Sequence, residues 1–306
     1  MSVLIVGSVA LDDIATPVEA HKNLLGGSAS YAAISASYFS PVQFVGIVGK
    51  DFPEEHLAFI KSRDIDLEGL QVVDGETFRW SGKYHDDMNS RETLSVALNV
   101  FETFSPDLPA SYQNAEIVLL ANISPELQHH VLDQSKKPKF VIADTMDLWI
   151  DIAKDSLVKL LSRIDMLILN DGEARQLTGE SNLIVAGKKI QSMGPKYVAL
   201  KKGEHGCLLF GDNEFFSCPA FPLEEMLDPT GAGDTFAGGL AGYLAKKTQP
   251  GQEVSFSDLK EGVVYGSILA SFNVEKFSLE RMKTLDFSEV QKRLTELKNI
   301  ANFGEI

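Results

Sequence analysis

One short segment of this chain places a carboxylate directly after a glycine-containing turn. Residues Asp228–Gly239 read Asp-Pro-Thr-Gly-Ala-Gly-Asp-Thr-Phe-Ala-Gly-Gly. Gly231 and Gly233 allow backbone conformations that a side chain would forbid, and the free amides of a helix start favour an anion. We expect Asp234, in the first helical turn, to take a proton from a hydroxyl that attacks a phosphoryl group held over those amides.

An acidic residue at a helix start also has a purely structural use. Its interaction with the helix dipole is favourable by about 0.3–1 kcal/mol. The helix predicted for residues 235–247 favours the chemical role, because Gly238, Gly239 and Gly242 each cost about 1 kcal/mol relative to Ala in a helix interior. That cost indicates close backbone contacts along this helix.

Three further groups of residues could serve the same chemistry. Asn170 and Glu173 follow a predicted strand and begin a helix, with the spacing of a capping box that satisfies the helix amides. The Glu173 carboxylate could instead lie near Mg²⁺ on nucleotide phosphates, because hard cations prefer oxygen ligands. Lys201, Gly203 and Gly206 form a turn between two predicted strands, which is either a polar hairpin or a contact for phosphate and nucleotide.

The third group lies near the start of the chain. Gly26 and Gly27 open a predicted helix, and Asp12 lies in the segment before it. Backbone amides beside an acidic side chain suit a substrate with several hydroxyls. The structural alternative is a capped helix and a surface turn.

The elements that position these residues alternate between short apolar strands and amphipathic helices. This alternation predicts one α/β domain over residues 1–306, with a central, mostly parallel sheet flanked by helices on both faces. Ligands of such sheets bind outside the carboxyl ends of the strands. Strands are predicted at 3–6, 42–48, 117–120, 140–143, 166–169, 197–200 and 207–210. Helices are predicted at 28–38, 54–61, 125–134, 155–163, 173–177, 183–193, 235–247, 256–272 and 287–300.

Residues 77–101 interrupt the alternation. Two strand-like runs flank a polar turn at residues 86–90, with no crossover helix between them. This pattern predicts a β-hairpin outside the main sheet. The hairpin is either a small lid over the site or a decorated edge of the sheet.

The composition limits the classes of protein to consider. The 306 residues are 44% hydrophobic, enough for a substantial core. A net charge of −15 argues against nucleic-acid or anionic-membrane partners, which need a basic surface. Cys207 and Cys218 are the only cysteines, too few for a disulfide framework or a zinc site. With no basic leader and no run of about 18 apolar residues, we expect a soluble, cytoplasmic protein.

The Asp228–Gly239 segment resembles the C-terminal signature of the PfkB, or ribokinase-like, family of carbohydrate and nucleoside kinases. The Gly-Gly helix, the Asn-x-x-Glu pair and the Lys-x-Gly-x-x-Gly turn follow the family's order, and the resemblance covers about residues 3–282. It implies a ribokinase-like α/β fold with a small β-sheet lid, here residues 12–25 and 75–103. It also implies ATP as donor, Mg²⁺ as cofactor and a sugar as acceptor.

The resemblance implies a role for each candidate residue. Asp234 would be the base that activates the acceptor hydroxyl. Gly231, Ala232 and Gly233 would form the anion hole for the transferred phosphoryl group. The nucleotide-binding residues would be Asn170, Glu173, Lys201, Gly203, Gly206, Val263, Gly266 and Asn273. The substrate-binding residues would be Asp12, Gly26, Gly27, Tyr31 and Trp80.

The resemblance also implies metal ions and a partner. Glu173 would act on Mg²⁺, directly or through water. Asp228 would be a ligand of a monovalent cation such as K⁺, although an Asp before a helix needs no ion to explain it. The lid would also offer a contact for a homodimer.

One departure from the family pattern bears on the acceptor. Tyr31 stands where many sugar kinases of the family have Asn, and it offers an aromatic face instead of an amide. With Phe78 and Trp80 in the lid it could stack on a base or a sugar ring, or all three could be core residues. A nucleoside kinase is therefore the nearest alternative to a sugar kinase. Three basic lid residues leave a phosphorylated acceptor open: Arg79, Lys83 and Arg91.

Other classes of protein fit less well. A sensor that binds nucleotide or sugar without catalysis should have lost the base or the anion hole, and Asp234 with both turn glycines is intact. A Rossmann oxidoreductase would show G-x-G-x-x-G after a strand, and a P-loop enzyme would show G-x-x-x-x-G-K-[ST]. The sequence contains neither pattern.

Overall fold

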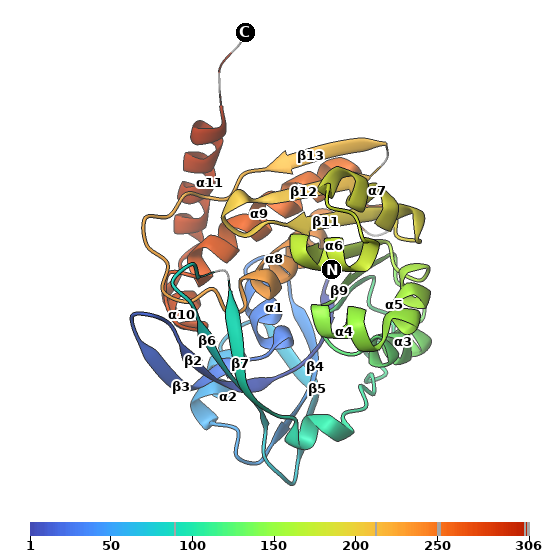
Figure 1. Cartoon of the computed structure of the whole chain (residues 1–306). Helices are drawn as coiled ribbons and strands as arrows, with labels where there is room; N and C mark the ends of the chain where they lie inside the picture. Colours follow the sequence, from blue (N-terminus) through green and yellow to red (C-terminus); the bar gives the residue numbers. More distant parts are fainter. Residues whose placement is uncertain (89, 212, 250–251, 303, 305–306) are drawn as a thin grey trace.

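The computed structural model describes residues 1–88, 90–211, 213–249, 252–302 and 304. Strands of the central sheet are β1 (Val3–Val6), β4 (Val42–Gly49), β5 (Ile65–Val73), β8 (Ile117–Leu120), β9 (Phe140–Asp144), β10 (Met166–Asn170), β11 (Tyr197–Lys201), β12 (Cys207–Gly211) and β13 (Glu214–Cys218). Within the described residues they form one nine-stranded sheet, in the order β13-β12-β11-β10-β9-β8-β1-β4-β5 (Figure 1). Neighbours from β5 to β11 pair in parallel, and β12 and β13 extend the β11 edge in antiparallel. The predicted parallel sheet is confirmed.

Helices cover both faces of this sheet. On one face lie α1 (Ser28–Ala36), α2 (Glu54–Lys61), α8 (Ala232–Lys247), α9 (Phe256–Asn273), α10 (Glu280–Thr284) and α11 (Phe287–Ala301). On the other lie α3 (Pro125–Gln134), α4 (Asp147–Ile152), α5 (Lys154–Leu161), α6 (Asp171–Thr178) and α7 (Leu183–Ser192). Strand β1 shows why two cores form, since Val3 and Ile5 belong to the first and Leu4 and Val6 to the second. Within the described ranges, no helix is long and apolar enough to cross a membrane.

A second, smaller sheet contains β2 (Ala10–Ala15), β3 (Ala20–Gly26), β6 (Phe78–Tyr84) and β7 (Arg91–Ala97), in the order β3-β2-β6-β7. It lies at the lower left of Figure 1, beside the region of α1 and α8. Strands β6 and β7 form the predicted hairpin, and β2 pairs with β6 in parallel. Asn89, in the predicted turn, lies outside the described residues.

The structure adds elements that the sequence did not predict. Strand β5 is one edge of the central sheet, where it exposes Asp66 and Glu68 and buries Ile65 and Gly69. Because of these polar residues, the strand was not predicted from the sequence. Strand β13 is the opposite edge and is mostly exposed. Helix α4 is short, and short helices give a weak periodic signal. The 3₁₀ segments η1 (Asn99–Thr103) and η2 (Gly203–His205) were also not predicted.

Candidate active site

The glycine turn and the start of α8 form the centre of the site. Gly231 is the N-cap, with φ of 72° in the left-handed region, and α8 begins at Ala232. A Cβ on Gly231 would lie 2.3 Å from the ring of Tyr31. Both the backbone conformation and the packing therefore require glycine here. Asp234 lies in the first turn of the helix, as the sequence predicts.

Asp234 is a half-buried carboxylate in an acidic neighbourhood. Burial and, to a lesser extent, the charge of Asp144 raise its pKa to about 7, although Lys201 and Arg91 act in the opposite direction. A general base is most effective when its pKa lies near the working pH. The surroundings of Asp234 thus match the task of deprotonating a hydroxyl near neutral pH.

This pKa predicts the pH dependence of catalysis. The base must be ionised, so kcat/KM should rise as pH increases through about 7 and level off above it. Initial rates measured across about pH 5 to 9 at saturating ATP would show this limb. A rate that is unchanged through neutrality would contradict the role of Asp234.

Lys201 is the last residue of β11, and the end of its side chain lies beside the glycine turn. Its Nζ lies 3.4 Å from each carboxylate oxygen of Asp144, at the end of β9. A Cβ on Gly233 would lie only 2.8 Å from the same Nζ. The sequence predicted a contact between Lys201 and nucleotide, and the structure places its ammonium beside the predicted anion hole.

Asn170 and Glu173 form a capping box at the start of α6. The Asn170 side chain accepts the Glu173 amide at 2.8 Å, and Glu173 Oε2 accepts the Asn170 amide at 2.7 Å. Burial raises the pKa of Glu173 to about 7, with Lys201 opposing the rise and Asp144 adding to it. The purely structural role of these residues, a capping box, is thus present. The Glu173 carboxylate also lies at the carboxyl edge of the sheet, so its role near Mg²⁺ stays a prediction.

Gly203 and Gly206 lie in the turn between β11 and β12. Gly206 has φ of 82°, and a Cβ there would lie 2.0 Å from the carbonyl oxygen of Cys218. The Lys202 amide donates to the Gly206 carbonyl at 2.7 Å and closes the turn. These contacts explain both glycines as parts of a tight turn, and their nucleotide contact stays a prediction.

The three candidate residues on α9 are packed against protein. Val263 is a core residue, and a Cβ on Gly266 would lie 2.5 Å from the carbonyl oxygen of Phe236 on α8. Asn273 is fully buried and donates through Nδ2 to the Thr230 carbonyl at 2.9 Å. Gly266 thus lets α8 and α9 approach closely, and a contact of these residues with adenine remains a prediction.

Asp12, Gly26 and Gly27 come together beside α1. A Cβ on Gly26 would lie 2.0 Å from Asp12 Oδ2, so glycine is what leaves room for this carboxylate. Gly27 has φ of 89° and packs on the Ser8 carbonyl. Asp12 is buried, and burial is the main cause that raises its pKa well above the ordinary value. The charges of Asp228, Asp234 and Asp13 raise it as well.

The two aromatic candidates differ in their surroundings. Trp80 lies opposite Asp12 in the pairing of β6 with β2, is half-buried, and has the Arg91 guanidinium 5.9 Å from its ring centre. Tyr31 is only 1% exposed, and Gly231 covers its ring. Its hydroxyl has no hydrogen-bond partner among the described residues. The ring of Trp80, unlike that of Tyr31, keeps accessible surface for a ligand.

The face of the small sheet that carries Asp12 and Trp80 is turned towards the catalytic turn. Tyr84 lies on the same face, and its hydroxyl is 3.1 Å from Thr230 Oγ1, one residue before Gly231. Tyr84 and Trp80 also pack with Leu227 in one apolar cluster. The small sheet therefore contacts the chemistry-bearing segment directly.

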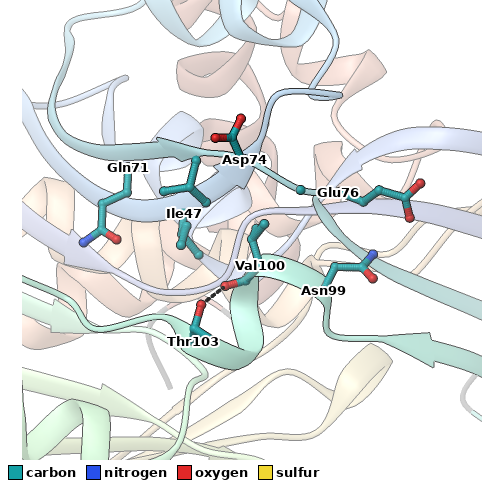
Figure 2. Close-up of a pocket in the computed structure, with 9 residues that line it drawn as sticks. Ile47, Gln71, Asp74, Glu76, Asn99, Val100 and Thr103 are labelled. Atoms are coloured by element: carbon teal, nitrogen blue, oxygen red, sulfur yellow. Dashed lines mark hydrogen bonds between the residues drawn. The ribbon is translucent and has the colours of Figure 1, made fainter.

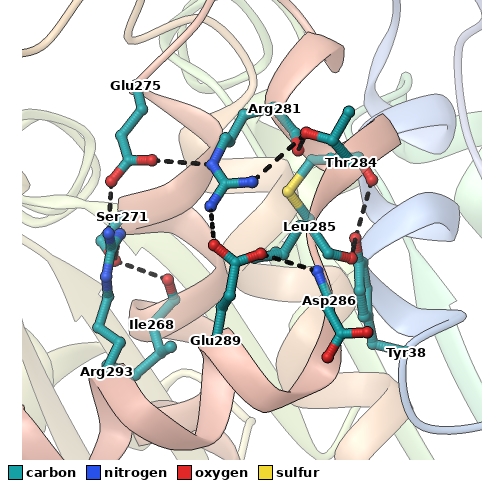
Figure 3. Close-up of polar contacts among 11 residues, drawn as sticks. Tyr38, Ile268, Ser271, Glu275, Arg281, Thr284, Leu285, Asp286, Glu289 and Arg293 are labelled. Atoms are coloured by element: carbon teal, nitrogen blue, oxygen red, sulfur yellow. Dashed lines mark hydrogen bonds and ion pairs between the residues drawn. The ribbon is translucent and has the colours of Figure 1, made fainter.

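Asp228 is held by backbone amides. Its Oδ1 accepts the Thr230 amide at 2.8 Å and its Oδ2 accepts the Ser278 amide at 2.9 Å. The loop that carries Ser278 is fixed by Glu275, which binds Arg281 and Arg293, while Arg281 also binds Glu289 (Figure 3). This ion-pair cluster ties the end of α9 to α10 and α11, and so determines where the Ser278 amide lies.

Two residues of this region, Asp144 and Tyr84, were not predicted from the sequence, and a third, Arg91, was given another role. Asp144, Tyr84 and Arg91 all act on the catalytic segment or on its neighbours. Asp144 had a signal, since it is an acidic residue at the end of a wholly apolar strand. Arg91 had been considered only as a contact for an acceptor phosphate, and its proximity to Asp234 depends on the fold of the hairpin.

A separate hollow of about 490 Å³ lies beside the carboxyl ends of β4 and β5 and the 3₁₀ segment η1. Figure 2 shows its polar lining, with Gln71, Asp74, Glu76 and Asn99 around Ile47 and Val100. None of its lining residues is a candidate site residue. This hollow is therefore distinct from the site around Asp234.

The fold and the position of Asp234 beside the glycine turn fit a phosphotransferase that acts on an alcohol. The sequence matches the model of the pfkB family carbohydrate kinases over residues 4–284. The chain therefore belongs to the pfkB family, and it is an enzyme that phosphorylates an alcohol group.

Individual relatives agree with this family. The chain is 31% identical to a cytidine kinase from Thermococcus kodakarensis, covering 79% of this chain and 88% of that protein. The crystal structure of the Methanocaldococcus jannaschii nucleoside kinase, described as an archaeal member of the ribokinase family, has a TM-score of 0.76, with 19% identity and 96% and 98% coverage. Arabidopsis thaliana ribokinase with ribose and ATP has a TM-score of 0.75, with 24% identity and 95% and 98% coverage. The ribokinase-like fold is confirmed.

Proposed function

We propose that this kinase transfers the γ-phosphoryl group of ATP to a sugar hydroxyl, and that the sugar is the ribose of a nucleoside. One observation carries the choice of acceptor: the small sheet presents the Asp12 carboxylate beside the half-buried ring of Trp80. A carboxylate suits the ribose hydroxyls, and an indole suits the flat face of a base. The 31% identity to a cytidine kinase supports the same acceptor class.

In the proposed reaction Asp234 takes the proton of the acceptor hydroxyl. The hydroxyl oxygen bonds to the γ-phosphorus, the bond to the bridging oxygen of ATP breaks, and ADP leaves with that electron pair. The amides at Gly231, Ala232 and Gly233 would bind the charge on the transferred group, as the start of α8 favours an anion. This turn is thus the proposed anion hole.

The carboxyl edge of the central sheet would hold the nucleotide. Mg²⁺ fits here because Glu173 is a carboxylate at the edge of the sheet where the phosphates are expected, whereas the described residues contain no cluster of three His, Cys, Asp or Glu that could hold a metal alone. An ion held partly by ATP phosphates matches that arrangement. When bound, Mg²⁺ would neutralise charge on those phosphates. The remaining nucleotide contacts are proposed for Asn170, Lys201, Gly203, Gly206, Val263, Gly266 and Asn273.

A free sugar is the second candidate acceptor. The observation in its favour is that Tyr31 is covered by Gly231 and so offers no ring face to a base. Asp12 with Gly26 and Gly27 would then suffice to bind hydroxyls. A non-catalytic sensor is disfavoured, because Asp234 with its pKa near neutrality lies at an intact anion-binding turn.

ADP release should be measured against nucleosides, free sugars and sugar phosphates. We expect turnover with a nucleoside, and we expect Trp80→Ala to raise the KM for it by about 10-fold, since stacking on a base contributes on the order of 1–3 kcal/mol. Phe215→Ala, on the exposed edge strand β13, is the matched aromatic control. Turnover of sugars alone, with no effect of Trp80→Ala, would favour the second candidate.

We propose that catalysis requires no K⁺ ion at Asp228. Both carboxylate oxygens already accept backbone amides, and the Thr230 carbonyl accepts the Asn273 amide. A cation bound to any of these oxygens would share it with an N–H donor, which weakens the attraction of that oxygen for the ion. We predict that replacing K⁺ by N-methylglucamine leaves kcat unchanged at constant ionic strength. A loss of turnover that K⁺ restores would show that the loop opens to bind an ion.

We further propose a cytoplasmic protein that forms a homodimer through the small sheet. Its edge strand β7 is exposed along its whole length, including Leu94 and Val96, each 54% exposed. Exposed apolar groups on an edge strand suit pairing with a second copy. Sedimentation velocity with Leu94→Lys would test this contact.

A further inference from the structure

Lys201 and Asp144 end two strands that lie on either side of β10. The pairing places Lys201 beside Asn170 and Asp144 beside Ile168. The Lys201 side chain reaches across the end of β10, because its Nζ lies 3.4 Å from both oxygens of Asp144. This buried contact therefore spans three strands at the edge where such sheets bind ligands.

The Asp144 carboxylate is held in place by its own surroundings. Its Oδ1 accepts the Thr145 amide at 2.9 Å. The buried Gln128 amide donates to the Asp144 carbonyl at 3.0 Å and also to the Leu120 and Ala121 carbonyls. Asp144 is only 4% exposed. The carboxylate is thus pre-positioned before any ligand binds.

The Lys201 ammonium lies between this carboxylate and the catalytic turn. It has three N–H donors, and its distance of 3.4 Å to each Asp144 oxygen exceeds the roughly 2.7–2.9 Å of a strong charged hydrogen bond. The position of a Cβ on Gly233 is 2.8 Å away, with no side chain there. Asp144 therefore orients the ammonium without using all of its donors.

The charges around Lys201 keep it protonated. Burial lowers the pKa of Lys201, but the nearby carboxylates outweigh that effect and raise it above its ordinary value. The carboxylates that act on it are Asp144, Glu173 and Asp234. A permanent cation is therefore available beside the turn that is proposed to bind the phosphoryl group.

We propose that Asp144 is a positioning residue that holds the Lys201 ammonium beside Gly233, where the ammonium contacts the phosphoryl group during transfer. The inference rests on the proposed function of the Gly231–Asp234 segment. Asp144 acts through Lys201 and touches no substrate. Its charge matters because an unpaired lysine would turn towards the other carboxylates and leave the anion hole.

A double-mutant cycle on kcat tests this coupling. Asp144→Asn keeps the size of the side chain and should lower kcat by about 10- to 100-fold, and Lys201→Met by about 100- to 1,000-fold, with KM values within about threefold. If Asp144 acts through Lys201, the double variant should be no slower than Lys201→Met alone. Effects that multiply in the double variant, or a loss that follows the folded fraction, would overturn the proposal.

Asp147→Asn is the matched control. Asp147 lies three residues further on at the start of α4, is exposed, and contacts its own Leu148 amide, which Asn can still accept. Its kcat should equal that of wild type. If Asp147→Asn lowered kcat as much as Asp144→Asn, any change of charge at this edge would lower kcat, and the contact with Lys201 would not be the cause.

A binding measurement separates this proposal from the identity of the acceptor. Mg²⁺ and ADP with fluoroaluminate mimic the transferred group, and calorimetry can compare the complex with Mg²⁺ and ADP alone. Asp144→Asn keeps Lys201. In this variant the increase in affinity that fluoroaluminate gives should be smaller by about 10-fold or more, while the affinity for ADP stays unchanged. If the variant kept the full increase in affinity, the positioning role of Asp144 would be wrong. If wild type turned over no tested acceptor, the proposed function would be contradicted instead, and the binding result would still decide the role of Asp144.

Discussion

Asp234→Asn should lower kcat by about 10³-fold or more while the protein stays folded and binds ATP. Asn has the shape of Asp but cannot take a proton from the acceptor hydroxyl. Burial and Asp144 raise the pKa of Asp234 to about 7, so ionising this group destabilises the folded state. That penalty grows as pH rises from the unfolded pKa towards about 7. The variant should therefore melt no lower than wild type at pH values above about 7.

Two measurements check this expectation. Initial rates give kcat, and thermal melting on either side of neutrality gives the stability change. The difference in melting temperature between variant and wild type should shrink as pH falls, because wild-type Asp234 becomes protonated. If Asp234→Asn kept more than about a tenth of wild-type turnover, another group would be the base.

Gly233→Val should remove activity with little cost in stability. The three atoms nearest to a Cβ at this position all belong to the Lys201 side chain, whose Nζ is 2.8 Å away and can move. The displaced ammonium and the added methyl groups would damage the anion hole, for an expected loss of about 10²- to 10³-fold in kcat. The rate and the melting temperature should be measured on the same preparation.

Gly231→Ala is the informative comparison for that variant. Gly231 has φ of 72°, which costs a residue with a Cβ about 1–2 kcal/mol, and the Cβ would also press on the buried ring of Tyr31. Here stability should fall together with activity. If Gly233→Val melted as low as Gly231→Ala, its loss of turnover would reflect folding and not the anion hole.

The sequence was most informative where burial is uniform. Strands β1 and β8 were predicted with their observed bounds, because both are short runs of fully buried apolar residues. Strands β5 and β13 were missed, since edge strands carry polar residues and resemble loops. Helix α8 begins three residues before the predicted Thr235, because the glycine turn itself supplies its N-cap.

For the site, sequence patterns identified residues but not their neighbours. The Gly231–Asp234 turn and the capping box of α6 are local, so spacing along the chain was enough to predict them. The contact between Lys201 and Asp144 joins strands 57 residues apart across β10, and no local pattern reports it. Tyr31 shows that closeness in sequence can also mislead. It follows the candidate glycines Gly26 and Gly27, but its ring is packed against Gly231.

The small sheet has a consequence for how enzymes of this architecture can diverge. Its hydrogen-bonded ladder is separate from that of the central sheet, and one of its faces, with Asp12 and Trp80, is turned towards the site. Under the proposed function, substitutions on that face would change the acceptor without altering the register of the strands that carry Asp144 and Lys201. Gene duplication followed by a few changes in two hairpins is then a short evolutionary route to a new substrate, and the same positions are the natural targets for directed evolution.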